Sequence, residues 1–237
     1  STGGYTGSFV GRNYGIIINC LNKASVSGAA NTGGITGSLE DSCAIVNTAN
    51  TGNVTGSGNY AGGLVGSSSA STKGAMLLNV YNTGTVTATG QYAGGISQNP
   101  SSKEFLRNAY STGNVSGSGS YVGGVFGRYQ SRADVFLTNI NNAYFLKTDT
   151  INQTMNAVGT GPSATPDYTA AVNAMPKSED NLKALAPALG SAFAADDGNI
   201  NNGYPVLAWQ NTGIFPALES DGVKISAITA ENAKISL

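Results

Sequence analysis

Histidine is absent from all 237 residues of the sequence. Its absence excludes HExxH zinc peptidases, Ser-His-Asp and Cys-His hydrolases, and every metal site built on imidazole. A P-loop is missing too, and the Gly pairs recur inside a β-type repeat rather than between a strand and a helix, so no dinucleotide fingerprint is present. We therefore expect no cofactor, no metal site and no enzyme of these classes.

Charge is scarce, since only 11% of the residues are charged and the net charge is −1. With 40% hydrophobic residues, the chain has too little charge for a disordered protein. It also has no apolar run near the roughly 20 residues that a membrane-spanning helix needs. No basic face is clustered enough to neutralise phosphates, so we expect neither a nucleic-acid partner nor a membrane span.

Cysteine is limited to Cys20 and Cys43, which fit no metal spacing and are too few for a disulfide framework. Alternation of side chains along a strand places the two at opposite parity in the repeat. We therefore expect two small apolar residues, with a Cys20–Cys43 disulfide as the less favoured alternative.

Proline is almost missing from the first part of the chain, where Pro100 is the only one before Lys147, while six follow it. Glycine shows the reverse, with 26 residues before Lys147 and 7 after. This change predicts a repeat region over residues 1–149, a different segment over 150–216, and a linker with the start of a further module over 217–237. The chain begins in mid-repeat without a signal peptide, so we expect a piece of a longer protein.

The first region is built from an internal repeat with two markers. One marker is a Gly-Gly pair, found at Gly33-Gly34, Gly62-Gly63, Gly94-Gly95 and Gly123-Gly124, with a degenerate copy near Gly7. The other is an asparagine at Asn19, Asn47, Asn79, Asn108 and Asn142. From Asn to Gly-Gly the interval is 14, 15, 15 and 15 residues, and we call this the fixed leg. From Gly-Gly to the next Asn it is 12, 14, 17, 14 and 19 residues, and we call this the variable leg.

A fixed leg joined to a variable leg is typical of a stacked coil with insertions on one side. Frequent glycine and β-branched residues disfavour helix, and in a solenoid equivalent residues lie ~4.8 Å apart and stack. We predict an all-β fold, a parallel β-helix or β-solenoid of ~29-residue rungs with three short strands and three corners each. Glycine should serve corners that require a positive φ. The files expected to stack are Val26, Val54, Val86 and Val115; Ile35, Leu64, Ile96 and Val125; Tyr81, Tyr110 and Tyr144; and Tyr60, Tyr92 and Tyr121.

The pattern Y-x-G-G-[LIV]-x-G, with N-x-x-N-T-G-x-V-x upstream, resembles the GLUG-motif repeats. The resemblance covers residues 1 to about 146, with departures at Ser8 and at Ser97-Gln98. Such repeats occur in bacterial surface proteins and in non-catalytic parts of IgA-specific metallopeptidases. The resemblance implies an extracellular place, on the bacterial surface or secreted.

The second segment reads as a small mixed α/β cap for the last rung. Ser178 is a candidate N-cap followed by acidic residues, and Leu182, Leu185 and Leu189 have helical spacing that Pro187 interrupts or restarts. Residues 204–209, which include the only tryptophan, read as a strand. The stretch from Asp197 to Asn202 reads as an Asx-rich turn, with a calcium loop as the less favoured alternative because positions 6 and 12 do not match.

Catalytic carboxylates need a facing pair, and the only plausible one in the repeat is Glu104 with Asp134. Both lie beside basic residues in the variable leg, so solvated loop charge is the favoured interpretation and no catalytic residue is assigned. Nine of the 12 charged residues up to Lys147 lie in this leg, where insertions often form a binding surface. The candidate binding residues are Arg12, Tyr14, Lys73, Lys103, Glu104, Arg128, Tyr129, Arg132 and Asp134.

Two functions follow from these patterns. The first is a non-catalytic extracellular repeat segment, which serves as a stalk, a display scaffold or an adhesin-like region for a host glycan or protein. The second is a carbohydrate-active β-helix, a glycosidase or lyase, or its accessory domain. The sequence favours the first.

Overall fold

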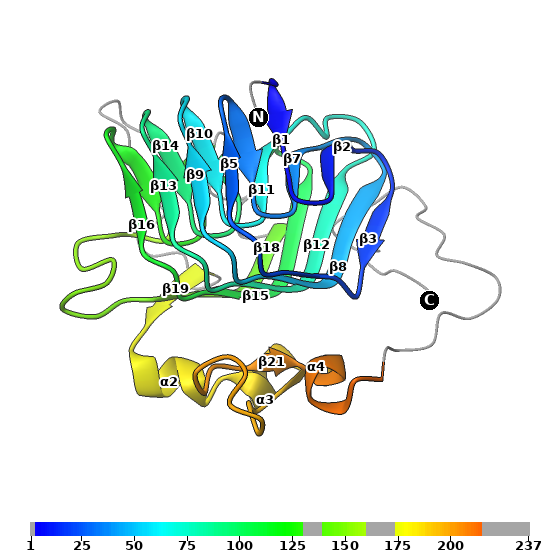
Figure 1. The fold of residues 1–237 in the computed structure, drawn as a ribbon, viewed down its shortest axis with the longest axis vertical. Coiled ribbons are helices and arrows are strands. Elements are labelled where there is room, and N and C mark those ends of the chain that lie inside the picture. Colours follow the sequence, from blue (N-terminus) through cyan, green and yellow to red (C-terminus); the bar gives the residue numbers. More distant parts are fainter. Residues whose placement is uncertain (1–2, 130–138, 160–173, 215–237) are drawn as a thin grey trace.

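The computed structural model describes residues 3–129, 139–159 and 174–214. The chain winds into a parallel β-solenoid of about five turns with ~29-residue rungs, which confirms the predicted fold class (Figure 1). Each complete rung passes through four parallel sheets rather than three, because the variable leg forms a short strand of its own. We name the sheets A to D.

Sheet A contains β1 (Tyr5–Thr6), β6 (Asn31–Gly33), β10 (Tyr60–Gly62), β14 (Tyr92–Gly94) and β17 (Tyr121–Gly123). Sheet B contains β2 (Val10–Asn13), β7 (Thr36–Leu39) and β11 (Val65–Ser68), and single bridges continue it through Ser97, Phe126 and Val158. Sheet C contains β3 (Ile16–Ile18), β4 (Leu21–Asn22), β8 (Cys43–Asn50), β12 (Ala75–Asn82), β15 (Glu104–Ser111), β18 (Ile140–Leu146) and β19 (Ala174–Lys177). Sheet D contains β5 (Val26–Gly28), β9 (Val54–Gly56), β13 (Val86–Ala88) and β16 (Val115–Gly117).

The predicted files stack as expected. The valine file runs in register along sheet D, and the file that begins at Ile35 is wholly buried in the interior core. The rings of Tyr81 and Tyr110 are parallel with centroids 5.0 Å apart, and those of Tyr92 and Tyr121 are 4.7 Å apart. Aligned identical residues therefore fix the register of one rung on the next.

Four of the marker asparagines, Asn47, Asn79, Asn108 and Asn142, form a ladder in which each side chain bonds to its counterpart in the neighbouring rung. The Nδ2 of Asn79 donates to the Oδ1 of Asn47 at 2.9 Å, and Asn108 and Asn142 repeat the contact at the same distance. All five marker asparagines, Asn19 included, have a positive φ between 46° and 58°. Asparagine tolerates this left-handed conformation better than other non-glycine residues.

The repeat glycines have a different role from the one predicted, since none of the Gly-Gly pairs has a positive φ. They are required for close approach between rungs. A Cβ on Gly34 would lie 2.2 Å from the carbonyl oxygen of Gly63 and 2.5 Å from Cγ of Asn50. The left-handed conformation expected of glycine is thus supplied by asparagine.

Replacing Asn79 separates the contribution of the ladder hydrogen bonds from that of the left-handed backbone conformation. Asn79→Ala should lower the free energy of unfolding by about 2 kcal/mol, because it removes ladder hydrogen bonds and places alanine in a left-handed conformation. Asn79→Gly removes the same bonds but tolerates the backbone, so it should be the more stable variant. In an ordinary strand an alanine gives a more stable protein than a glycine. If urea denaturation shows that the Asn79→Ala variant is more stable than the Asn79→Gly variant, the left-handed conformation of Asn79 does not contribute to stability as proposed.

The left-handed asparagine also shifts the alternation of side chains along sheet C. Leu77 and Val80 are three residues apart, yet both belong to the interior core because Asn79 lies between them. The same shift makes Cys20 and Cys43 contact one core cluster, so the predicted opposite parity is wrong. Both thiols are free, since Cys20 is level with Thr48, about 16 Å along the strand from Cys43. Burial raises the pKa of Cys43 to about 12, which keeps that thiol protonated.

The second segment begins as part of the coil. The backbone N–H groups of Gly124 and Val125 donate to the carbonyls of Asn156 and Ala157, each at 2.9 Å, so the stack continues past residue 149. The later elements are α2 (Glu179–Lys183), α3 (Ala186–Leu189), the antiparallel pair β20 (Phe193–Ala194) and β21 (Val206–Leu207), and α4 (Ala208–Thr212). We call residues 178–213 the flanking segment.

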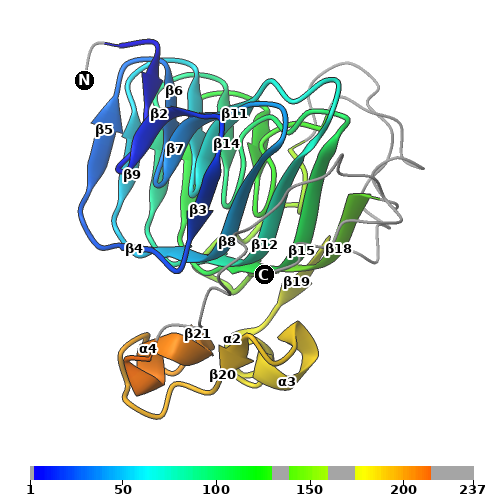
Figure 2. The same ribbon diagram turned by 90° about the vertical axis from the view of Figure 1, so that its right-hand side faces the viewer.

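The flanking segment lies along the outer face of sheet C and not over the last rung, where the sequence analysis placed it (Figures 1 and 2). The helix start at Ser178 and the restart at Pro187 are confirmed. The predicted strand over 204–209 is only two residues long, because the side chain of Gln210 accepts the backbone N–H of Leu207 at 2.7 Å and starts α4. Trp209 is therefore helical.

Residues 217–237 lie outside the described residues, as does most of the stretch between the coil and the flanking segment. Within the described part, no helix is long and apolar enough to cross a membrane.

Candidate binding groove

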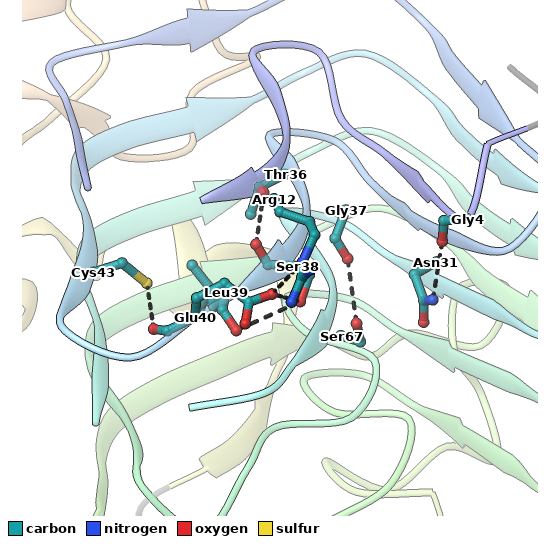
Figure 3. A network of polar contacts seen from close by, with 10 residues as sticks. All are labelled: Gly4, Arg12, Asn31, Thr36, Gly37, Ser38, Leu39, Glu40, Cys43 and Ser67. Atoms are coloured by element: carbon teal, nitrogen blue, oxygen red, sulfur yellow. Dashed lines mark hydrogen bonds and ion pairs between the residues drawn. The ribbon is translucent and has the colours of Figure 1, made fainter. Parts of the chain in front are cut away.

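Two of the predicted binding residues of the variable leg, Arg12 and Tyr14, lie in one network of contacts. Arg12 donates from Nε to Oε1 of Glu40 at 2.8 Å, and its guanidinium lies over the rings of Tyr5 and Tyr14. Glu40 also accepts from the Ser38 hydroxyl at 2.9 Å. Figure 3 shows Arg12, Ser38 and Glu40 of this network together with polar neighbours from adjacent rungs. Tyr14 is 64% exposed at the surface beside this network.

The loops of successive rungs are tied together in the same leg. Oδ1 of Asp41 accepts the backbone N–H groups of Thr72, Lys73 and Gly74 at 2.9, 2.8 and 3.2 Å. Lys103 donates from Nζ to the carbonyl of Thr72 at 2.8 Å. Lys73 and Lys103 are exposed, whereas Asp41 mainly holds the loop of the next rung.

Two predicted surface residues are buried. Tyr129 is 1% exposed and packs against Phe126, while Arg128 lies half-buried with its guanidinium 5.2 Å from the Tyr121 ring centroid. Glu104 is 0% exposed, so the expectation of solvated loop charge is wrong for this residue. Arg132 and Asp134 lie outside the described residues.

Glu104 faces the coil interior because it is in register with Cys43 and Ala75, which are both core residues. Burial raises its pKa to about 7, and the nearby hydroxyls of Ser68 and Ser97 partly counteract that rise. These hydroxyls approach the carboxyl group without the geometry of a hydrogen bond. A carboxyl group enclosed in this way cannot reach a polysaccharide outside the coil.

The described residues do form a groove, and it lies between the coil and the flanking segment. The two parts share a hydrophobic cluster in which Tyr81 and Tyr110 of sheet C pack on Phe193. The Tyr81 hydroxyl donates to Oε1 of Gln210 at 2.9 Å, and burial raises its pKa to about 12, so it stays protonated.

Further hydrogen bonds hold the flanking segment in place. The Tyr110 hydroxyl donates to the carbonyl of Pro205 and accepts from Nδ2 of Asn201 at 2.8 Å. Trp209 donates from Nε1 to the carbonyl of Asn47 at 3.2 Å. Asp196 closes the neighbouring turn by accepting three backbone N–H groups, from residues 200, 201 and 203. The predicted Asx-rich turn is thus present, with Asp196 rather than Asp197 at its centre.

The groove encloses about 640 Å³. Its coil side carries Lys23, Thr51, Thr83 and Thr112, and its other side carries Ile200, Tyr204 and Trp209. None of the predicted binding residues lines it. One periodic feature of the sequence does mark the groove: a lysine or threonine directly follows Asn22, Asn50, Asn82 and Ser111 in four successive rungs.

Comparison with known proteins gives one informative match. No protein-family model matches the chain, and no curated protein does. The fold is similar to the crystal structure of a protein from Bacteroides ovatus proposed to be an immunoglobulin A1 protease, with a TM-score of 0.56 and 21% identity. The similarity covers 82% of this chain and 57% of that chain. At this identity it shows the fold, and the resemblance to GLUG-motif repeats continues to rest on the residues quoted for it.

Proposed function

We propose that this chain is a non-catalytic segment of an extracellular bacterial protein that serves as a rigid scaffold with an adhesin-like binding region. The observation that carries the proposal is the chemistry of the coil: its one candidate catalytic carboxylate within the described residues, Glu104, is enclosed in the interior. The outer surface instead offers a groove of hydroxyl, amide and aromatic groups. The similarity to a larger bacterial protein supports a role as one part of a longer chain.

The test is a cleavage assay on the purified chain. Incubation with immunoglobulin A1 and with a panel of polysaccharides should give no new peptide fragments by mass spectrometry and no new reducing or unsaturated sugar ends. Antibodies to the chain should bind intact cells of the producing organism or its culture medium. Turnover that survives purification would contradict a non-catalytic role, and confinement to the cytosol would contradict the extracellular one.

A further inference from the structure

The coil side of the groove is a straight file of polar side chains. The backbone N–H groups of Thr51, Thr83 and Thr112 donate to the carbonyls of Asn22, Asn50 and Asn82 in the preceding rung, at 2.8 to 2.9 Å. These equivalent contacts place one threonine on each rung at ~4.8 Å steps. Lys23 holds the same position one rung earlier, since Asn22 is in register with Asn50. Thr51 and Thr83 are partly exposed, Thr112 is 7% exposed, and the Thr51 hydroxyl donates to the carbonyl of Asn22 at 3.2 Å, which leaves its oxygen as an acceptor. The file therefore places hydroxyl groups at regular intervals along the coil axis.

The opposite side of the groove is aromatic and apolar. Trp209 and Tyr204 are partly exposed there, and Ile200 is 56% exposed on the rim. Lys183 lies 5.4 Å from the Tyr204 ring centroid and covers part of that ring. An exposed isoleucine beside a tryptophan and a tyrosine is the kind of surface on which an apolar ring face packs.

Polar groups of the flanking segment complete the lining. Oε1 of Gln210 accepts both the Tyr81 hydroxyl and the Leu207 N–H, so its amide N–H donors remain for another partner. Asn202 is exposed and also lines the groove. No carboxylate is among the lining residues. The groove thus combines rigid aromatic faces with many neutral donors and acceptors.

We infer that this groove binds an oligosaccharide, which lies along the coil axis between the threonine file and Trp209. A sugar chain has apolar ring faces for Trp209 and Tyr204, and hydroxyl groups that recur along its length for the threonines. A peptide strand would instead pair with the free edge of a sheet, and this groove presents side chains rather than an edge. The inference deepens the proposed binding function and rests on it.

The test uses Trp209 as its own reporter, because it is the only tryptophan in the chain. The chain is screened on a printed array of mammalian, bacterial and plant oligosaccharides, and the strongest binder is titrated in solution. Binding in the groove should change the tryptophan fluorescence in a saturable way. No array binder, or a binder that leaves the fluorescence unchanged, would overturn the inference.

Two sets of variants locate the site. Thr83→Val with Thr112→Val removes two hydroxyls at nearly constant volume and should weaken binding at least tenfold. Thr55→Val is the matched control, because Thr55 is exposed on sheet D away from the groove, and it should bind normally. Trp209→Ala should abolish binding, and the threonine variants keep the inference testable if that change loosens α4. Equal affinity in all threonine variants would overturn the inference.

The same measurements distinguish a second copy of the chain in the groove from a glycan. They also distinguish failure of this inference from failure of the proposed function. If the fluorescence changes with protein concentration alone and the chain dimerises, a second copy fills the groove and the inference is wrong. Absence of glycan binding would leave the non-catalytic scaffold role standing. Cleavage of a substrate would contradict that role without removing binding at the groove.

Discussion

Replacing Gly63 with alanine should lower the free energy of unfolding by about 3 kcal/mol, the upper part of the range for overpacking. The added Cβ would lie 2.0 Å from the carbonyl oxygen of Gly95 and 2.5 Å from Cγ of Asn82. Neither neighbour can move cheaply. The carbonyl belongs to the next rung, and Asn82 accepts from Asn50 at 2.8 Å while donating to the carbonyl of Gly84 at 2.9 Å.

The effect should be specific to the contact between rungs. Gly15→Ala is the control, because a Cβ at Gly15 has no atom within 4 Å. Since each rung contacts only its neighbours, the Gly63 variant weakens one interface in mid-coil, and its unfolding should also become less cooperative. Urea denaturation followed by circular dichroism measures both quantities. Equal midpoints for the two variants would show that the Gly-Gly pairs are not needed for close approach.

The coil could be predicted because the same residue types recur at equivalent positions in every rung. Tyr60, Tyr92 and Tyr121 align from sequence spacing alone, and so do the valines of sheet D. Each such file is an independent indication of the same register, and together they leave little freedom for another fold.

Two errors in the coil, the side-chain parity of the cysteines and the role of the glycines, have one physical origin, the left-handed asparagine. Strict alternation gives Cys20 and Cys43 opposite faces, but a left-handed residue within sheet C shifts the alternation by one. An asparagine repeated at strand centres could have indicated this, since asparagine is the residue other than glycine that enters this conformation most readily. Because the asparagines adopt the positive φ, the Gly-Gly pairs are needed for the close approach between rungs and not for a left-handed backbone.

The groove could not be predicted because it forms between segments far apart in the sequence. Asn47 accepts from Trp209, and Tyr81 donates to Gln210, across 162 and 129 residues. The sequence shows that tyrosines stack two residues after the marker asparagine, but not that a later segment covers them. Charge density pointed instead to the variable leg, where Arg12 and Glu40 pair with each other.

The buried carboxyl group of Glu104 should make the stability of the protein depend on pH in an unusual direction. Its pKa is about 7 in the native state, against an ordinary value of 4.5 in the unfolded chain. Below pH 4.5 both states hold the proton, and the stabilising contribution is fully present. As the pH rises toward 7, the unfolded chain releases the proton and the native state keeps it, so the free energy of unfolding falls. The total loss is about 3 kcal/mol, and it is complete above pH 7.

Glu104→Gln should remove this dependence, because the amide is neutral at every pH and nearly equal in volume. At pH 8 the variant should be more stable than the native protein by up to about 3 kcal/mol, and at pH 4.5 the two should be nearly equal. Glu40→Gln is the matched control. Glu40 is also nearly buried but is paired with Arg12 and Ser38, so its loss should destabilise the protein slightly at pH 8. Urea denaturation between pH 4.5 and 8 distinguishes the cases. A Glu104 variant that is no more stable than the native protein at pH 8 would mean that the carboxylate has a compensating partner in the native state.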